Sequence, residues 1–180
     1  MDDEKEFIAA LLNPKTQNNA FRQLVARYNR PLYSHIRNIV LNHDDTDDVL
    51  QNTFIKIFQN LKNFKGESKL FSWIYRIATN EALTLISQRA KKGGITNEEV
   101  NERAVQNLVA DEYFEGDAIQ LKLQQAVASL PEKQQLVFKM RYFEEIKYEE
   151  MSEILGTSVG ALKASYHHAV KKIEDYVTTH

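Results

Sequence analysis

The sequence predicts an all-α protein made of two small helical domains joined by an acidic linker. Apolar residues recur at intervals of three and four over long stretches of the 180 residues, and the alternation typical of strands is almost absent. The periodicity lapses between Ile95 and Gly116, and residues 93–120 hold seven acidic residues but one basic residue. We therefore expect a helical bundle over residues 1–92, a flexible acidic linker over 93–117 with a transient helix around Glu98 to Leu108, and a second helical domain over 118–180.

The first domain should begin with three helices. Apolar spacing predicts a short helix over residues 7–12 and a long one over 21–40, which Pro31 should kink or restart. Acidic side chains favour a helix N-terminus, so the third helix should begin with a cap among residues 44–46. Its core-facing residues should be Leu50, Phe54, Ile57, Phe58 and Leu61.

A fourth helix, from Leu70 to Ser87, should be central to the first domain. It follows a loop that contains Gly66, and Ser68 is a candidate cap. Glu81 conflicts with the apolar arc in which it falls. A basic tail and Gly93-Gly94 should end the helix. The arc itself comprises Leu70, Phe71, Ile74, Ile77, Ala78, Ala82, Leu85 and Ile86.

The second domain has the layout of a helix-turn-helix. Helical periodicity returns at Ala118, and Pro131 should begin a further helix. A short helix, a turn at Gly156, a cap at Ser158 and a longer last helix then follow. Because ordinary helical bundles contain such hairpins too, this layout alone leaves DNA binding open.

Composition excludes several classes of protein. The absence of cysteine rules out disulfides, thiolate zinc sites and a cysteine nucleophile. No catalytic motif is present, and His35 and His43 should be partly exposed side chains and not metal ligands, so we expect neither an enzyme nor a cofactor nor a metal site. The acidic start is followed by no apolar run of signal-peptide or membrane-span length, which predicts a soluble, intracellular protein.

One edge of the central helix carries a distinctive stripe of Trp73, Arg76, Asn80 and Ser87. An indole, a guanidinium that can pair with phosphate and an amide together suit an unstacked nucleotide base on its backbone. The alternative is that Trp73 belongs to the core, as aromatic residues often do.

The preceding helix presents Asp48, Gln51, Asn52 and Ile55 within about 60° of each other, away from its core stripe. An exposed isoleucine framed by polar residues suits a small docking patch. A solvated helix face with a single apolar residue is the alternative.

The last helix turns a small and basic side outward. Small residues allow close approach to base edges, and lysines can contact phosphates. The outward residues are Gly160, Ala161, Ala164, Ser165, His168, Lys171 and Lys172.

Four segments in this order resemble the bacterial group IV sigma factors, the extracytoplasmic-function (ECF) type. FRQLVARYNRPLY and DDTDDVLQNTFIKIFQNL are similar to the first half of sigma region 2. NFKGESKLFSWIYRIATNEA is similar to the segment of that family that reads the minus-10 promoter element, and LPEKQQLVFKMRYFEEIKYEEMSEILGTSVGALK is similar to sigma region 4. The resemblance covers nearly the whole chain.

The resemblance implies a cytoplasmic subunit that directs core RNA polymerase to promoter DNA. Asp48, Gln51, Asn52 and Ile55 would dock on the β′ clamp helices, region 4 would bind the β flap, and an anti-sigma factor would inhibit the protein. The implied minus-10 contacts, which capture a flipped base, are Phe64, Lys69, Trp73, Arg76 and Asn80. The implied minus-35 contacts are Ser158, Gly160, Ala161, Lys163, Ala164, Ser165, His168, Lys171 and Lys172.

The last helix departs from the family pattern. Family members often carry arginines where this chain has Ser165, His168 and Val170, so a weaker electrostatic grip on the minus-35 element is expected. Two other functions compete with the sigma factor: a stand-alone helix-turn-helix regulator that binds duplex DNA without polymerase, and a helical interaction protein with no nucleic-acid role.

Overall fold

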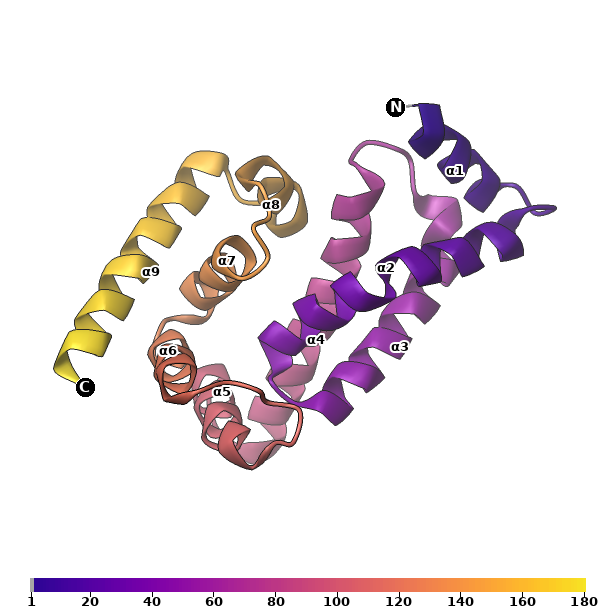
Figure 1. The fold of residues 1–180 in the computed structure, drawn as a ribbon. Helices are drawn as coiled ribbons and strands as arrows, with labels where there is room; N and C mark the ends of the chain where they lie inside the picture. Colours follow the sequence, from indigo (N-terminus) through magenta and orange to yellow (C-terminus); the bar gives the residue numbers. More distant parts are fainter. Residues whose placement is uncertain (1) are drawn as a thin grey trace.

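The computed structural model describes residues 2–180 and confirms the all-α class (Figure 1). Within this range the N-terminal unit consists of α1 (Asp2–Leu12), α2 (Gln17–Val40), α3 (His43–Asn60), the short η1 (Leu61–Asn63) and α4 (Leu70–Gly93). The connecting segment contains α5 (Asn97–Gln106) and η2 (Leu108–Ala110). The C-terminal unit consists of α6 (Ala118–Ala128), α7 (Glu132–Tyr142), α8 (Tyr148–Leu155) and α9 (Val159–Thr179).

The N-terminal unit is a bundle in which α2, α3 and α4 pack against one another, with α1 across one end (Figure 1). α2 is a single helix that continues through Pro31, without the restart that the sequence suggested. At its end Leu41 takes a left-handed conformation (φ 62°), and Asn42 caps α3 by accepting a hydrogen bond from the amide of Asp45. The cap therefore lies just before the acidic cluster in which the sequence placed it.

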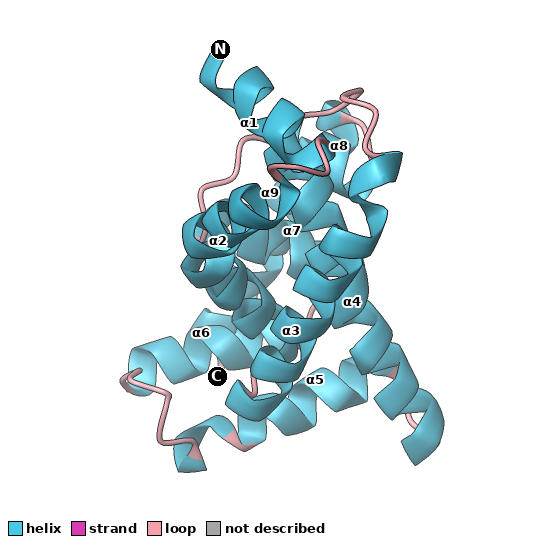
Figure 2. Cartoon of the chain, turned by 90° about the vertical axis from the view of Figure 1, so that its right-hand side faces the viewer, coloured by secondary structure: helices cyan, strands magenta, loops and turns pink. Residues whose placement is uncertain are grey.

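The connecting segment contains a helix where a transient one was expected, and it is more ordered than a flexible linker. Thr96 and Glu99 form a reciprocal capping box at the start of α5. The Thr96 side chain accepts a hydrogen bond from the Glu99 amide, and the Glu99 side chain accepts one from the Thr96 amide. Leu41 of the N-terminal unit, Val105, Leu108 and Ala128 of α6 form a small apolar cluster. Figure 2 shows α5 and α6 lying across one end of the bundle. The acidic segment is therefore packed against both units.

The C-terminal unit contains the predicted helix-turn-helix, formed by α8 and α9. Gly156 ends α8 with a φ of 65°, a conformation that favours glycine, and Ser158 caps α9 through a 3.2 Å hydrogen bond from the Ala161 amide to its Oγ. A local core lies between α6, α7 and α9: Ala126, Val127, Leu130, Phe138, Ala169 and Ile173.

The two units share one continuous apolar core. Residues of the C-terminal unit join the cluster that includes Leu70 and Ile74 of α4, so the units pack directly on each other. The contributing C-terminal residues are Leu136, Val137, Met140, Ile146, Met151, Ile154 and Leu162.

Several side chains lie elsewhere than the periodicity suggested. Phe58 is 41% exposed and is not a core residue, and Val177 on α9 is exposed too. Lys69, not Ser68, occupies the cap position of α4, with no side-chain cap. Glu81 resolves its conflict with the apolar arc by pairing with Lys56 of α3. Within residues 2–180, no helix is both long and apolar enough to cross a membrane.

Candidate nucleic-acid interface

A cavity of about 350 Å³ lies between the loop after η1 and the first two turns of α4. Phe64 and Trp73 form one side of it, with ring centroids 5.0 Å apart and planes tilted by 49°. Gly66 in the loop has a φ of +73°, so this turn favours glycine. The complete lining is Asn63, Phe64, Lys65, Glu67, Ser68, Trp73, Arg76 and Glu153.

Trp73 fits both roles that the sequence left open, a core residue and a surface on which a base can stack. It is partly buried and packs against the core of the bundle, and it also lines the cavity beside Phe64. Phe64 itself is buried, so its ring is a fixed support and not a mobile surface group. The two aromatic residues therefore form a preorganised apolar surface.

The two basic residues at this end of α4 contact the C-terminal unit. The Arg76 guanidinium donates a hydrogen bond to the backbone carbonyl of Glu153 in α8. The Lys69 ammonium lies 3.5 Å from Oε1 of Glu150, and its backbone amide lies 3.4 Å from Oε2 of Glu153. Both basic residues are nonetheless exposed, and the Lys69 side chain is 58% exposed.

Asn80 does not reach the Phe64 cavity. It is exposed one helical turn beyond Arg76 and borders a separate shallow depression of about 380 Å³ on α4. The other residues of that depression are Leu83, Thr84, Ser87, Gln88 and Lys91. The structure thus places Phe64, Trp73 and Arg76 at one cavity and Asn80 at another depression, with Lys69 just before α4 and in neither lining.

The predicted docking residues of α3 share one accessible side. Asp48, Gln51 and Asn52 are exposed, and Ile55 is 47% exposed. An apolar depression of about 380 Å³ adjoins them and also involves Phe21, Val25, Phe54, Phe58 and Gln59. We missed Phe58 in the sequence because we assigned it to the core. The signal was present, since Gln51, Ile55 and Phe58 are spaced by four and three along the helix.

The outward side of α9 is open. Gly160, Ala161, Lys163, Ala164, His168, Lys171 and Lys172 are exposed, and Ser165 is partly buried. Ser158 differs from these residues because its hydroxyl oxygen already accepts the capping hydrogen bond. The side chain that begins the predicted minus-35 surface is therefore also part of the helix start.

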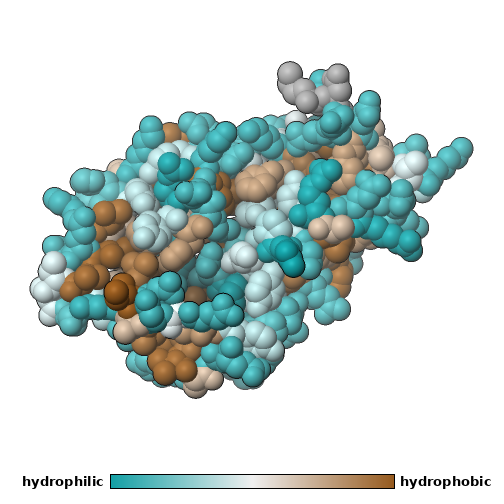
Figure 3. Space-filling model, viewed as in Figure 1, coloured by the Kyte–Doolittle hydropathy of each residue, from teal (hydrophilic) through white to brown (hydrophobic). Residues whose placement is uncertain are grey.

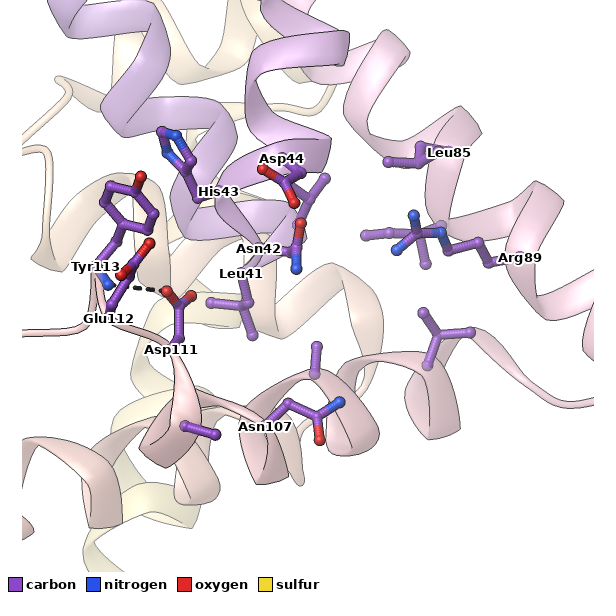
Figure 4. Close-up of a pocket in the computed structure, with 15 residues that line it drawn as sticks. Leu41, Asn42, His43, Asp44, Leu85, Arg89, Asn107, Asp111, Glu112 and Tyr113 are labelled. Atoms are coloured by element: carbon purple, nitrogen blue, oxygen red, sulfur yellow. Dashed lines mark hydrogen bonds between the residues drawn. The ribbon is translucent and has the colours of Figure 1, made fainter.

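A further polar cavity of about 560 Å³ lies between the α2–α3 turn, α4 and the connecting segment (Figure 4). The ring of Tyr113 stacks on His43 at 3.8 Å, and Asp111 accepts a 2.7 Å hydrogen bond from Arg37. Burial alone would raise the pKa of Asp111, but the Arg37 guanidinium and the Tyr113 amide hold it below its usual value. These contacts fasten the acidic segment to the N-terminal unit.

One sequence interpretation is corrected near these sites. His35 is fully buried, not partly exposed, and Thr79 of α4 and Glu144 of the α7–α8 loop both bond to its ring. Arg89, in the basic tail of α4, forms a two-pronged ion pair with Asp45 of α3. Tyr75 beside His35 has its pKa raised, first by burial and then by the charge of Glu144.

The geometry defines a class: an all-α, two-unit protein with a helix-turn-helix and an aromatic and basic cavity on a separate bundle. Two family models match it, sigma-70 region 2 over residues 24–92 and sigma-70 region 4 over residues 120–173. Among similar proteins, the ECF RNA polymerase sigma-E factor of Haemophilus influenzae is 27% identical over 168 residues, covering 88% of this chain and 87% of that protein. The ECF RNA polymerase sigma factor SigW of Bacillus subtilis is 29% identical over 161 residues, covering 85% and 86%.

Solved structures share the fold. CnrH, in complex with the cytosolic domain of CnrY, aligns with a TM-score of 0.69 and 20% identity over 98% of this chain and 97% of that chain. RpoE of Bartonella quintana, in complex with the anti-sigma factor NepR, aligns with a TM-score of 0.65 and 18% identity over 88% and 96%. The chain belongs to the sigma-70 family, in its ECF group. Its function is to direct transcription initiation by RNA polymerase.

Proposed function

We propose that this sigma factor opens promoter DNA by holding a base of the nontemplate strand in the cavity that Phe64 and Trp73 line on one side. The observation that carries the proposal is the position of this aromatic cavity next to Arg76 and Lys69, on the helix that completes region 2. Extracting a base costs a few kcal/mol, and stacking on an aromatic side chain contributes about 1–3 kcal/mol per base. Stacking in the cavity would therefore offset much of the free-energy cost of extracting that one base.

The remaining minus-10 residues have separate roles in the proposal. Arg76 and Lys69 pair with backbone phosphates at the mouth of the cavity. Asn80, one turn further along α4, contacts the strand beside the captured base. No covalent chemistry is required of the protein, so the proposed role is not enzymatic.

We propose that α9 reads the minus-35 element in the major groove. Its exposed small residues allow close approach to the bases, and Lys163, Lys171 and Lys172 supply contacts to phosphates. Ser165, His168 and Val170 replace the arginines common in the family, so affinity for the minus-35 duplex is more modest.

The proposed partners follow from the exposed surfaces and the relatives. The exposed side of α3 docks on the β′ clamp helices through Asp48, Gln51, Asn52 and Ile55. The adjoining apolar depression, which Phe21 and Phe58 help to line, extends this docking surface. The C-terminal unit binds the β flap, and Figure 3 shows apolar surface gathered on its side of the molecule. Because two solved relatives are held by CnrY and NepR, we also propose an anti-sigma partner, in the cytoplasm.

Run-off transcription tests the function. Core polymerase with this protein should initiate on promoters upstream of genes induced by its overexpression, where core alone does not. If instead the protein alone binds those duplexes tightly and adds nothing to transcription by core enzyme, the stand-alone regulator is the correct assignment.

The docking surface has its own test. The double variant Gln51→Ala, Ile55→Glu should abolish co-purification with core polymerase, because it removes an amide and buries a new charge in the contact. The matched control is Gln120→Ala, Ile119→Glu, which makes the same changes on α6, where Ile119 is 79% exposed. Unchanged co-purification of the α3 variant with normal helicity would sink the docking assignment.

A further inference from the structure

The first helix, α1, lies outside the part of the chain that carries the proposed contacts. It precedes residues 24–92, which match sigma-70 region 2, so the family assignment gives it no role. It nevertheless packs against α2 and η1 across one end of the bundle (Figure 1). η1 leads directly into Phe64, which lines the aromatic cavity. α1 therefore contacts the segment from which the cavity begins.

The buried side of α1 is formed by Phe7 and Leu11, which lie one helical turn apart. Both belong to the apolar cluster that contains Leu61 of η1 and Phe64. Leu11 and Leu61 are each only 1% exposed. The guanidinium of Arg27 on α2 lies 4.5 Å from the centroid of the Phe7 ring, a cation–π contact that holds this ring against α2. α1 thus completes the core at the end of the bundle where η1 lies.

Two hydrogen bonds fix the end of α1 to the start of α2. The side-chain amide of Gln17 donates to the Leu11 carbonyl at 3.0 Å. The hydroxyl of Thr16 donates to the Ala10 carbonyl at 2.7 Å. These carbonyls are among the four that a helix C-terminus leaves without intrahelical partners. The direction of α1 relative to α2 is therefore defined by side chains as well as by packing.

η1 depends on this packing because its own structure contributes little. It is a 3₁₀ turn of three residues, and no side chain caps its start. The hydrogen bonds of such turns have poorer geometry than those of an α-helix. In a close-packed interior, removing a side chain allows its neighbours to move. The position of η1, and of Phe64 directly after it, therefore depends on the buried side of α1.

We propose that α1 is a positioning element for strand capture: Phe7 and Leu11 hold η1, and with it Phe64, in place. This inference rests on the proposed capture of a base in the aromatic cavity. Neither Phe7 nor Leu11 lines that cavity, so both act through Phe64, whose ring centroid lies 5.0 Å from that of Trp73. A binding surface is preorganised when residues outside it fix the positions of those that touch the ligand.

Binding of a single-stranded minus-10 oligonucleotide by the full chain separates positioning from stability. Leu11→Ala and the control Ile39→Ala remove the same number of carbon atoms from buried sites, and Ile39 lies near the other end of α2. Both variants should be less stable than the wild type. Only Leu11→Ala should weaken oligonucleotide binding, by about tenfold, and Leu11→Met should restore most of it. An equal loss in Ile39→Ala would overturn the proposal and leave α1 a role in stability alone.

Gln17→Ala gives a second route to the same result, because it frees the end of α1 without opening a core cavity. It should weaken oligonucleotide binding about threefold, while Asn18→Ala, at the exposed neighbour, should not. Binding of the minus-35 duplex should stay unchanged in every variant. If Leu11→Ala fails to fold, Gln17→Ala decides the question, and wild-type affinity in it would overturn the proposal.

The fluorescence of Trp73, the single tryptophan, separates this inference from the proposed function. Displacement of the Phe64 ring should admit water to the indole and move its emission to longer wavelength in Leu11→Ala, but not in Ile39→Ala. If this shift appears while the wild type binds no minus-10 oligonucleotide, base capture fails and the support of Phe64 by α1 stands. If the wild type binds and Leu11→Ala leaves emission and affinity unchanged, the positioning role fails alone.

Discussion

The two surfaces proposed to contact DNA differ in accessibility. The outward side of α9 is open along its length, with Lys171 and Lys172 exposed. The beginning of α4 packs against α8, and its basic residues already contact Glu150 and the Glu153 carbonyl, although the Lys69 side chain is still 58% exposed. The α9 surface is therefore the more accessible of the two.

The largest expected effect comes from replacing Lys139, which is buried between α7 and residues of α2, α4 and α5. Lys139→Met should stabilise the protein at pH 7 by about 3 kcal/mol, because the pKa of Lys139 falls from 10.5 to about 8 on burial. The unfolded chain binds more protons than the folded one between these values, so wild-type stability gains from this group as the pH rises through them. The advantage of the variant should therefore shrink towards pH 10.5.

Denaturant unfolding at pH 7 and pH 10 measures this difference. Lys133→Met, at an exposed lysine of the same helix, is the control and should match the wild type at both values. A variant that is no more stable than the wild type at pH 7 would contradict burial of the ammonium between the units.

The next largest effect concerns the aromatic cavity beside α4, which Phe64 and Trp73 line. Trp73→Ala should reduce run-off transcription by about 10-fold to 100-fold, because it removes the ring that lies against Phe64 in the cavity. Binding of the minus-35 duplex should be unaffected, and Trp73→Phe should restore part of the activity. Normal transcription by a folded Trp73→Ala protein would assign the indole to the core alone.

A smaller effect is confined to the open surface. Lys171→Ala with Lys172→Ala should weaken duplex binding about tenfold at moderate salt and lower the slope of log affinity against log salt by about 2. Lys5→Ala with Lys15→Ala removes two exposed lysines of the N-terminal unit and serves as the control. An unchanged salt slope would remove these lysines from the DNA contact.

The smallest effect concerns the start of α9. Ser158→Ala should cost about 1 kcal/mol of stability, because the Ala161 amide loses its capping partner. Thermal unfolding measures the loss, and Ser158→Asp should recover it. A loss of duplex binding larger than the loss of stability would show that Ser158 contacts DNA directly.

The sequence allowed most of the fold to be predicted, because helix periodicity and caps are local. The order of the helices, the turn at Gly156 and the Ser158 cap all follow from residues within a few positions of each other. The capping box of Thr96 and Glu99 is an equally local signal, and it would have indicated a stable α5 where only a transient helix was expected.

The packing of the two units on each other could not be predicted from local sequence patterns. Glu144 lies 109 positions from His35, and nothing near the histidine in the sequence indicates a buried partner. Periodicity identifies an apolar arc but not what covers each part of it. The apolar arc of α4 is broad because the helix packs against α2 and α3 on one side and against α8 on the other.

Acrylamide quenching of tryptophan fluorescence tests the base-capturing cavity most directly, because Trp73 is the single tryptophan and lines the cavity. The account predicts that a bound single-stranded minus-10 oligonucleotide slows the quenching of Trp73. Equal quenching with and without the oligonucleotide, at concentrations where it binds, would contradict the claim that Trp73 lies in the strand-capturing cavity.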